Sequence, residues 1–175
     1  MAVVQGAIDV SRELMKEKDF DGSTILGVHA EGPYISESKK GAQDAKYILK
    51  PDAEFVKKNA DVIRIITLAP EEDAGFGEIR KMARDTDVVV SMGHTSANYK
   101  TAVESVKAGV KHTTHLFNAM TPLAHRNPGI VGAALAADNV SVELIADTFH
   151  INPGLYSIIA KVKGRKMVLI TDCTR

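Results

Sequence analysis

The sequence lacks the features that mark disulfide-rich, membrane-spanning and nucleic-acid-binding proteins. Its 175 residues include one cysteine and no tryptophan, so Cys173 has no intramolecular disulfide partner. The 22 Lys and Arg residues balance 22 Asp and Glu residues, and a net charge of zero provides no long-range field for nucleic acid or anionic membranes. No apolar run approaches the roughly 20 residues of a bilayer span, and the N-terminus has no signal-peptide pattern. These absences predict a cytoplasmic protein with neither a nucleic-acid nor a membrane partner.

What the sequence does contain is typical of one globular α/β unit. Apolar residues make up 45% of the chain and charged residues 25%, which suits a compact fold. Short apolar runs predict six buried strands, at Thr24–Val28, Val62–Thr67, Asp87–Ser91, from Gly109 to His112, Val142–Ala146 and Met167–Ile170. Helical signals occur at Ala2–Lys18, Asp52–Asn59, Phe76–Arg84, Ser96–Ala108 and Pro153–Lys163. This alternation predicts a parallel sheet with both faces covered.

Side chains that bind metals or transfer protons follow most of the predicted strands. They are His29 and Glu31 after the first strand, His94 after the third, His115 after the fourth, His150 beyond the fifth and Asp172 after the sixth. Because the carboxyl ends of parallel strands form one rim, residues that are distant in sequence converge there. We therefore expect a shared site at this rim.

Three of these residues, Glu31, His94 and His115, form a candidate metal site. Imidazole and carboxylate ligands suit Zn²⁺ or Fe²⁺, and a catalytic site needs about three protein ligands and one open position for water. Such a cation lowers the pKa of the water toward neutrality, and a nearby carboxylate then handles the proton. Asp172 is the candidate for that carboxylate; the alternative is that it caps a turn after the last strand.

Motifs of other enzyme classes are missing. The sequence has no dinucleotide-binding, Walker A or nucleophile-elbow pattern, and Cys173 has no obvious activating base. Arg126 is either a solvated charge or an anion contact, for which phosphate is the natural partner. The stretch Gly32–Lys50 is too long for an ordinary connection, and long loops in compact domains are usually functional.

Several short segments have distinctive sequence motifs. In chain order they are Val28–Tyr34, Lys40–Gln43, Gly93–Thr95, Thr114–Met120, His125–Gly129, Glu143–Asp147 and Leu169–Asp172. In this order they closely resemble the N-acetylglucosamine-6-phosphate deacetylases of the amidohydrolase superfamily. The segment Thr114–Met120, followed by His125–Gly129, is particularly specific to this branch.

The resemblance implies metal-dependent hydrolysis of the acetamide of N-acetylglucosamine 6-phosphate, which gives acetate and glucosamine 6-phosphate. It places the metal ligands on Glu31, His94 and His115, with Zn²⁺ or Fe²⁺ as the cation, and the acid/base carboxylate on Asp172. It places substrate contacts on Ala42, Gln43, Asn118, Ala119, Arg126 and His150. In dimeric members the residue matching Arg126 reaches the neighbouring subunit's site, so a homodimer is implied.

The chain departs from the family pattern at single positions. Gln43 stands where many members have His, Thr148 where Gly is usual, and Cys173 where a small residue is common. Gln43 keeps the ability to hydrogen-bond a sugar hydroxyl.

The chain is also much shorter than the family proteins, which carry a small β-domain and a barrel whose first strand bears a His-x-His pair. The expected fold is therefore an incomplete (β/α)8 TIM-type barrel, with strands three to eight present. Residues 1–175 are expected to form a single partial catalytic domain without the N-terminal barrel strands and the small β-domain. Two alternatives stay open: a cyclic-amide hydrolase of the same superfamily, and a metal-binding barrel fragment without turnover.

Overall fold

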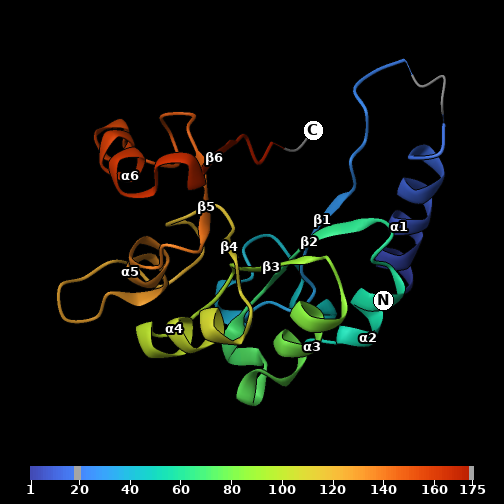
Figure 1. The fold of residues 1–175 in the computed structure, drawn as a ribbon, viewed down its shortest axis with the longest axis horizontal. Coiled ribbons are helices and arrows are strands. Elements are labelled where there is room, and N and C mark those ends of the chain that lie inside the picture. The colour runs from blue at the N-terminus through green and yellow to red at the C-terminus, as the bar shows by residue number, and fades with distance from the viewer. Residues whose placement is uncertain (18–20, 174–175) are drawn as a thin grey trace.

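The computed structural model describes residues 1–17 and 21–173, and its centre is one parallel sheet (Figure 1). The sheet has six strands in the order β1-β2-β3-β4-β5-β6, so each strand pairs with the next one along the chain. Their bounds are β1 Val28–Glu31, β2 Ile63–Leu68, β3 Val89–Met92, β4 His112–Thr113, β5 Ser141–Ile145 and β6 Met167–Ile170. This sequential parallel order is that of a barrel wall, and the described strands form an open part of one.

Helices connect the strands and pack around the sheet. They are α1 Ala2–Leu14, α2 Ala53–Lys58, α3 Gly77–Asp85, α4 Tyr99–Ala108, α5 Gly129–Ala136 and α6 Tyr156–Lys163. Two of them begin at side chains that accept from the first free backbone N–H groups, namely Asp52 for α2 and Asn98 for α4. None of the helices within the described residues combines the length and apolarity that a bilayer span requires.

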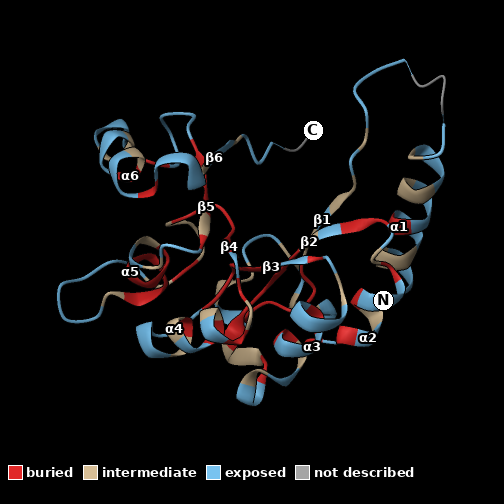
Figure 2. Cartoon of the chain, in the orientation of Figure 1, coloured by how far each residue is buried: buried red, intermediate tan, exposed pale blue. Residues whose placement is uncertain are grey.

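The core lies between the strands and the helices (Figure 2). Ile66 and Leu68 of β2, Met92 of β3 and Leu144 of β5 are all 0–1% exposed. Each such side chain contributes about 1.5–3 kcal/mol when fully buried. Polar side chains at strand positions or strand ends are also buried, namely Thr67, Ser91, Thr114 and Glu143. Residues of β1, β5 and β6, and residues just after β4 and β6, line a pocket. The expectation of two covered sheet faces is therefore wrong in part, because one face borders this pocket.

The six predicted strands and their parallel pairing are confirmed, but the first strand was placed too early. The run Thr24–Val28 was expected to be buried, whereas β1 begins at Val28 and Leu26 is 80% exposed. The carbonyl of Leu26 accepts a hydrogen bond from the Arg64 side chain rather than from a strand neighbour. The apolar run thus precedes the strand, and the polar positions His29 and Glu31 belong to β1 itself.

Helix α5 was not predicted. It contains two glycines, and its other residues are all Ala, Ile, Val or Leu (GIVGAALA), so it shows no amphipathic pattern. The pattern is missing because α5 is buried on most sides, packed between α4 and α6. The first helix is shorter than the expected Ala2–Lys18 and ends at Leu14; Lys18 lies outside the described residues.

Candidate metal centre

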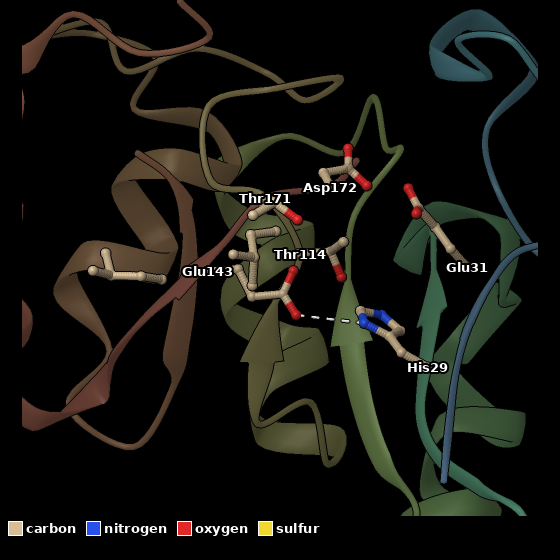
Figure 3. Close-up of a pocket in the computed structure, with 8 residues that line it drawn as sticks. His29, Glu31, Thr114, Glu143, Thr171 and Asp172 are labelled. Atoms are coloured by element: carbon tan, nitrogen blue, oxygen red, sulfur yellow. Dashed lines mark ion pairs between the residues drawn. The ribbon is translucent and has the colours of Figure 1, made fainter. Parts of the chain in front are cut away.

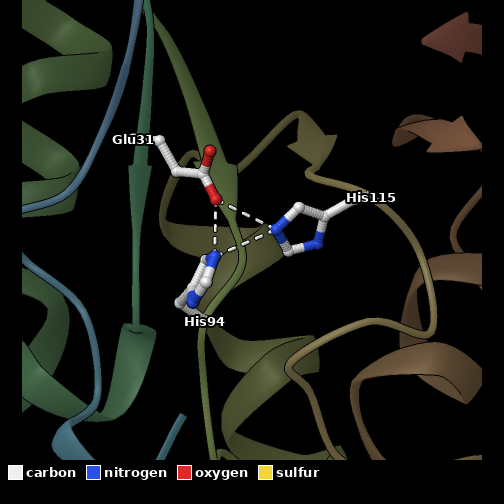
Figure 4. A group of neighbouring side chains, drawn as sticks. All are labelled: Glu31, His94 and His115. Atoms are coloured by element: carbon white, nitrogen blue, oxygen red, sulfur yellow. Dashed lines mark hydrogen bonds and ion pairs between the residues drawn. The ribbon is translucent and has the colours of Figure 1, made fainter. Parts of the chain in front are cut away.

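Three of the predicted residues meet at the carboxyl ends of their strands (Figure 4). Glu31 is the last residue of β1, His94 follows the end of β3, and His115 follows the end of β4. Oε1 of Glu31 lies 2.5 Å from Nε2 of His94 and 3.0 Å from Nε2 of His115. The two Nε2 atoms are 3.0 Å apart. The predicted convergence of these side chains is therefore observed.

The donor atoms of this cluster fit a divalent cation. Nδ1 of His94 lies 2.6 Å from the carbonyl oxygen of Lys39, which only accepts, so Nδ1 carries a proton and Nε2 is the nitrogen of this ring that a cation would bind. Zinc bonds of about 2.0–2.1 Å place tetrahedral ligand atoms about 3.3 Å apart; two of the observed spacings, both 3.0 Å, come near this value, and the third, 2.5 Å, is shorter. Glu31, His94 and His115 are a set that could hold a metal ion.

The electrostatics of the cluster keep its carboxylate charged. Hydrogen bonds from His115 and His94 hold the pKa of Glu31 well below its usual range. Burial acts to lower the pKa of His115, but the hydrogen bond and charge of Glu31 outweigh it, so the pKa is raised. An ionised Glu31 is the form that a cation needs as a ligand.

Three of the predicted site residues have unusual backbone conformations, which set the directions of their side chains. His94 has φ 45°, His115 has φ 30° and Asp172 has φ 50°, values that non-glycine residues adopt only when the surrounding structure holds them. Around His94 the holding groups are identifiable. Its carbonyl accepts from the Ser36 N–H at 2.8 Å, and the next two residues are bonded to Glu71, whose carboxylate accepts from the Thr95 hydroxyl at 2.5 Å and the Ser96 N–H at 2.6 Å.

A pocket of about 550 Å³ opens beside the cluster (Figure 3). The side chains that line it come from β1, β4, β5 and β6 and their ends: His29, Glu31, Thr114, Glu143, Leu169, Ile170, Thr171 and Asp172. Asp172 thus borders the same pocket as the candidate ligand Glu31. Among the described residues, this is the cavity that joins the predicted metal site to the predicted acid/base carboxylate.

A buried polar network lies beneath the cluster, and most of it was missed by sequence reasoning. Glu143 accepts from Nε2 of His112 at 2.9 Å and from the backbone N–H of His115 at 3.1 Å. His29 contacts the Thr67 hydroxyl at 2.7 Å and lies 3.4 Å from Glu143. The signal that could have found the network was a charged residue, Glu143, inside an otherwise apolar strand.

Burial and hydrogen bonds together set the charge states within this network. It lowers the pKa of His29, which is therefore neutral near pH 7. Burial also acts to raise the pKa of Glu143, but hydrogen bonds from His112 and the His115 backbone outweigh it and lower the pKa. Glu143 is accordingly a buried, ionised carboxylate whose hydrogen-bond donors are supplied by its neighbours.

Four of the predicted substrate contacts lie on the loops that carry the ligands. The Asn118 amide donates to the carbonyls of His115 and Leu116 at 3.4 Å, and the Ala119 carbonyl accepts from the Thr95 N–H at 3.0 Å. The Gln43 amide donates to the Glu31 carbonyl at 3.1 Å, while Ala42 is exposed. Gln43 therefore braces the strand end that carries Glu31, a contact that the sequence did not reveal.

The other two predicted contacts lie outside the cluster. Arg126 is exposed in the loop before α5, and His150 is exposed beyond β5. Nδ1 of His150 lies 2.6 Å from Oδ2 of Asp147, whose other oxygen accepts the backbone N–H groups of Phe149 and His150. These bonds lower the pKa of Asp147 to about 2. The His150 ring is thus held by a charged neighbour, with its Nε2 on the side away from Asp147.

Comparisons with solved structures show which proteins this chain resembles. The chain aligns with N-acetylglucosamine-6-phosphate deacetylase from Pasteurella multocida at a TM-score of 0.87 and 38% identity, covering 98% of this chain and 45% of that one. The Mycobacterium smegmatis deacetylase, solved in complex with N-acetyl-D-glucosamine-6-phosphate, aligns at a TM-score of 0.86 and 31% identity, covering 98% and 44%. The expectation of an incomplete barrel of this type is confirmed.

Sequence comparison leads to the same relatives. The chain is 43% identical to the N-acetylglucosamine-6-phosphate deacetylase of Bacillus subtilis over 165 residues, which are 91% of this chain and 41% of that protein. It therefore spans less than half the length of these relatives. Residues 4–175 match the amidohydrolase family. With its parallel strands, its Glu-His-His cluster and this match over nearly the whole sequence, the chain belongs to the amidohydrolase family.

Proposed function

We propose that this chain carries the metal centre and the proton-transferring carboxylate of an N-acetylglucosamine-6-phosphate deacetylase. The observation that carries the proposal is the convergence of Glu31, His94 and His115 beside a pocket that Asp172 also lines. Relatives that bear this name are 34–43% identical across most of the chain. The proposed reaction cleaves the acetamide C–N bond with water and yields acetate and glucosamine 6-phosphate.

The proposed cation is Zn²⁺, with Fe²⁺ as the alternative that the same ligands accept. When bound, it supplies Lewis acidity that makes water acidic enough to be deprotonated near neutral pH. Glu31 supplies the anionic ligand, and His94 and His115 supply neutral nitrogens.

The remaining steps belong to side chains of this chain. Asp172 accepts a proton from the attacking water, whose oxygen forms the new bond to the acetamide carbon. Asp172 then delivers that proton to the amine nitrogen as the C–N bond breaks. His150, held by Asp147, orients the acetamide by donating an Nε2–H hydrogen bond to its carbonyl oxygen, which stabilises the charge that develops on that oxygen.

Substrate selection is proposed to depend on groups away from the reacting bond. Arg126 provides a planar guanidinium for the 6-phosphate, and Asn118, Ala119, Ala42 and Gln43 border the sugar. A phosphate clamp of this kind fixes the orientation of the acetamide. We further propose that residues 1–175 act as one partial catalytic domain of a cytoplasmic homodimer in amino-sugar metabolism.

Acetate release tests the proposal. The zinc-loaded chain is incubated with N-acetylglucosamine 6-phosphate, with N-acetylglucosamine and with a cyclic amide, and the chelator-treated chain serves as the control. Metal-dependent release from the phosphorylated sugar alone supports the proposal. Equal turnover of both sugars contradicts the phosphate clamp, and turnover of the cyclic amide favours that other hydrolase class. Metal binding without any turnover favours a metal-binding barrel piece.

A further inference from the structure

Glu143 contacts the turn that carries His115 at two consecutive residues. Its side-chain Oε2 accepts the backbone N–H of His115 at 3.1 Å, and its own backbone carbonyl accepts the N–H of Leu116 at 2.9 Å. One residue earlier, the N–H of Thr114 still bonds to Met92 of β3. The backbone N–H groups therefore change their hydrogen-bond partner from β3 to β5 at His115. Glu143 of β5 supplies both of the new acceptors.

The carboxylate of Glu143 is itself held in place. Its Oε1 accepts from Nε2 of His112 at 2.9 Å, and Nδ1 of that ring lies 2.6 Å from the Ser141 hydroxyl. Glu143 is 3% exposed and His112 5% exposed. A buried carboxylate with both oxygens engaged has one accessible position, so it fixes the atom to which it is bonded.

The two imidazoles of the metal centre are oriented in different ways. The ring of His94 is held through Nδ1, which donates to the Lys39 carbonyl. The Nδ1 of His115 is buried and has no hydrogen-bond partner within residues 1–17 and 21–173. Apart from the contacts of its Nε2 within the cluster, the direction of the His115 ring is therefore set by its backbone, which has φ 30°, a conformation that needs an external restraint.

From these contacts we infer that Glu143 is a positioning residue for His115, holding the backbone of this ligand so that its Nε2 faces Glu31 and His94. His112 completes the restraint by fixing Glu143. The inference rests on the metal centre in the proposed function. The inferred role is geometric. It requires a hydrogen-bond acceptor on a side chain long enough to extend from β5 to the His115 N–H, and it does not require a negative charge.

Two substitutions of Glu143 separate the effect of side-chain length from the effect of side-chain charge. Glu143→Gln keeps the length and one carbonyl acceptor, and its amide can donate to His112 once that ring shifts its proton to Nδ1. Glu143→Asp keeps the charge but is one methylene shorter. Glu78→Asp is the matched control, because the Glu78 carboxylate also accepts a backbone N–H, that of Ala53 at 2.8 Å, on the helices α3 and α2.

Cobalt binding to the full chain is the readout, measured by titration with the visible absorption of Co²⁺ as a record of its ligand geometry. We expect Glu143→Asp to weaken binding by roughly tenfold or more and to change the spectrum, the size of effect known for groups that orient metal ligands. Glu143→Gln should stay within about threefold of the wild type, and Glu78→Asp should not differ from it. Wild-type binding by Glu143→Asp, or equal losses for Gln and Asp, would overturn the inference.

Hydrogen exchange of the wild-type chain provides a test that does not depend on a variant folding. The backbone amide of His115 should be protected from hydrogen exchange to the same degree as that of Leu116. If the His115 amide exchanges as fast as an amide in an exposed loop, the inference is overturned. The absence of cobalt binding by the wild-type chain would remove the metal centre and the inference with it. Cobalt binding without acetate release would instead contradict the deacetylase proposal and leave the role of Glu143 intact.

Discussion

The backbone carbonyl of Lys39 accepts a hydrogen bond from Nδ1 of His94 at 2.6 Å. This bond connects the long stretch Gly32–Lys50, which follows β1, with a ligand that follows β3. It selects the ring tautomer whose Nε2 lone pair faces Glu31. The length of this connection therefore has a structural purpose, because it supplies the group that orients His94.

Gly41→Ala should disturb this orientation. Gly41 has φ 58°, and a Cβ there would lie 3.4 Å from Cε1 of the His94 ring. We expect a stability loss of about 1 kcal/mol from the left-handed backbone and metal binding weakened severalfold. Gly75→Ala is the matched control, because Gly75 has φ 74° but nothing within 4 Å of an added Cβ. Titration with Zn²⁺ and denaturant unfolding check both effects; equal zinc affinity in the two variants would contradict the link to His94.

Replacing any one metal ligand should abolish tight binding. Glu31→Gln replaces the anionic ligand oxygen with a neutral amide oxygen, and His94→Asn and His115→Asn each remove a ligand nitrogen from the cluster. Each variant should lose zinc affinity by more than about 100-fold, beyond the losses typical of groups that only orient a ligand. Zinc retained after dialysis is measured, with exposed His125→Asn as the control. Unchanged retention in any of the three would remove that residue from the site.

Asp172→Asn should separate metal binding from catalysis. The amide has nearly the same shape as the carboxylate but cannot accept the proton from water. Zinc affinity should stay at the wild-type value while acetate release falls by about 10²–10⁴-fold, the usual contribution of a general acid–base group. Activity assays and zinc titration on the same preparation test this. A variant with the full rate would show that Asp172 only caps a turn after β6.

Arg126→Ala should change substrate preference rather than chemistry. Removing the guanidinium should raise KM for N-acetylglucosamine 6-phosphate and leave kcat/KM for the unphosphorylated sugar unchanged. The ratio of the two kcat/KM values is the measurement, and exposed Arg165→Ala provides a control of equal charge change. Preference for the phosphorylated sugar that survives in Arg126→Ala would assign the phosphate contact to another residue.

Stability at alkaline pH should depend on Lys163. This residue of α6 is 6% exposed, and its ammonium donates at 2.9 Å to the carbonyls of Ala134 and Ala137 at the end of α5. Burial lowers its pKa below the ordinary 10.5. Between the lowered value and 10.5 the unfolded chain binds more protons than the folded chain, so the free energy of unfolding rises with pH.

Lys163→Met removes this titration and leaves two carbonyls unpaired, which costs about 1–3 kcal/mol. The difference in unfolding free energy between wild type and variant should grow in favour of the wild type as the pH rises toward 10.5. Urea unfolding at a series of pH values measures it. A difference that shrinks over this range would mean that burial does not lower the pKa.

Sequence patterns predicted the sheet well because parallel strands are short apolar runs followed by functional polar residues. The ligands Glu31, His94 and His115 were found for the same reason, since each follows the apolar part of its strand. Helix α5 was missed because a helix buried on most sides has no polar face. The role of Glu143 was missed because its partner His112 lies on another strand, and pairing between strands is a property of the fold.

The positive φ angles at His94, His115 and Asp172 affect how this site can be dissected by mutagenesis. Alanine at these positions would carry the penalty of a left-handed backbone in addition to the loss of the functional group, and β-branched residues would carry more. Asparagine tolerates that conformation well. Alanine scanning would therefore overstate the chemical importance of all three residues, whereas asparagine substitutions measure the chemistry with the backbone largely unchanged.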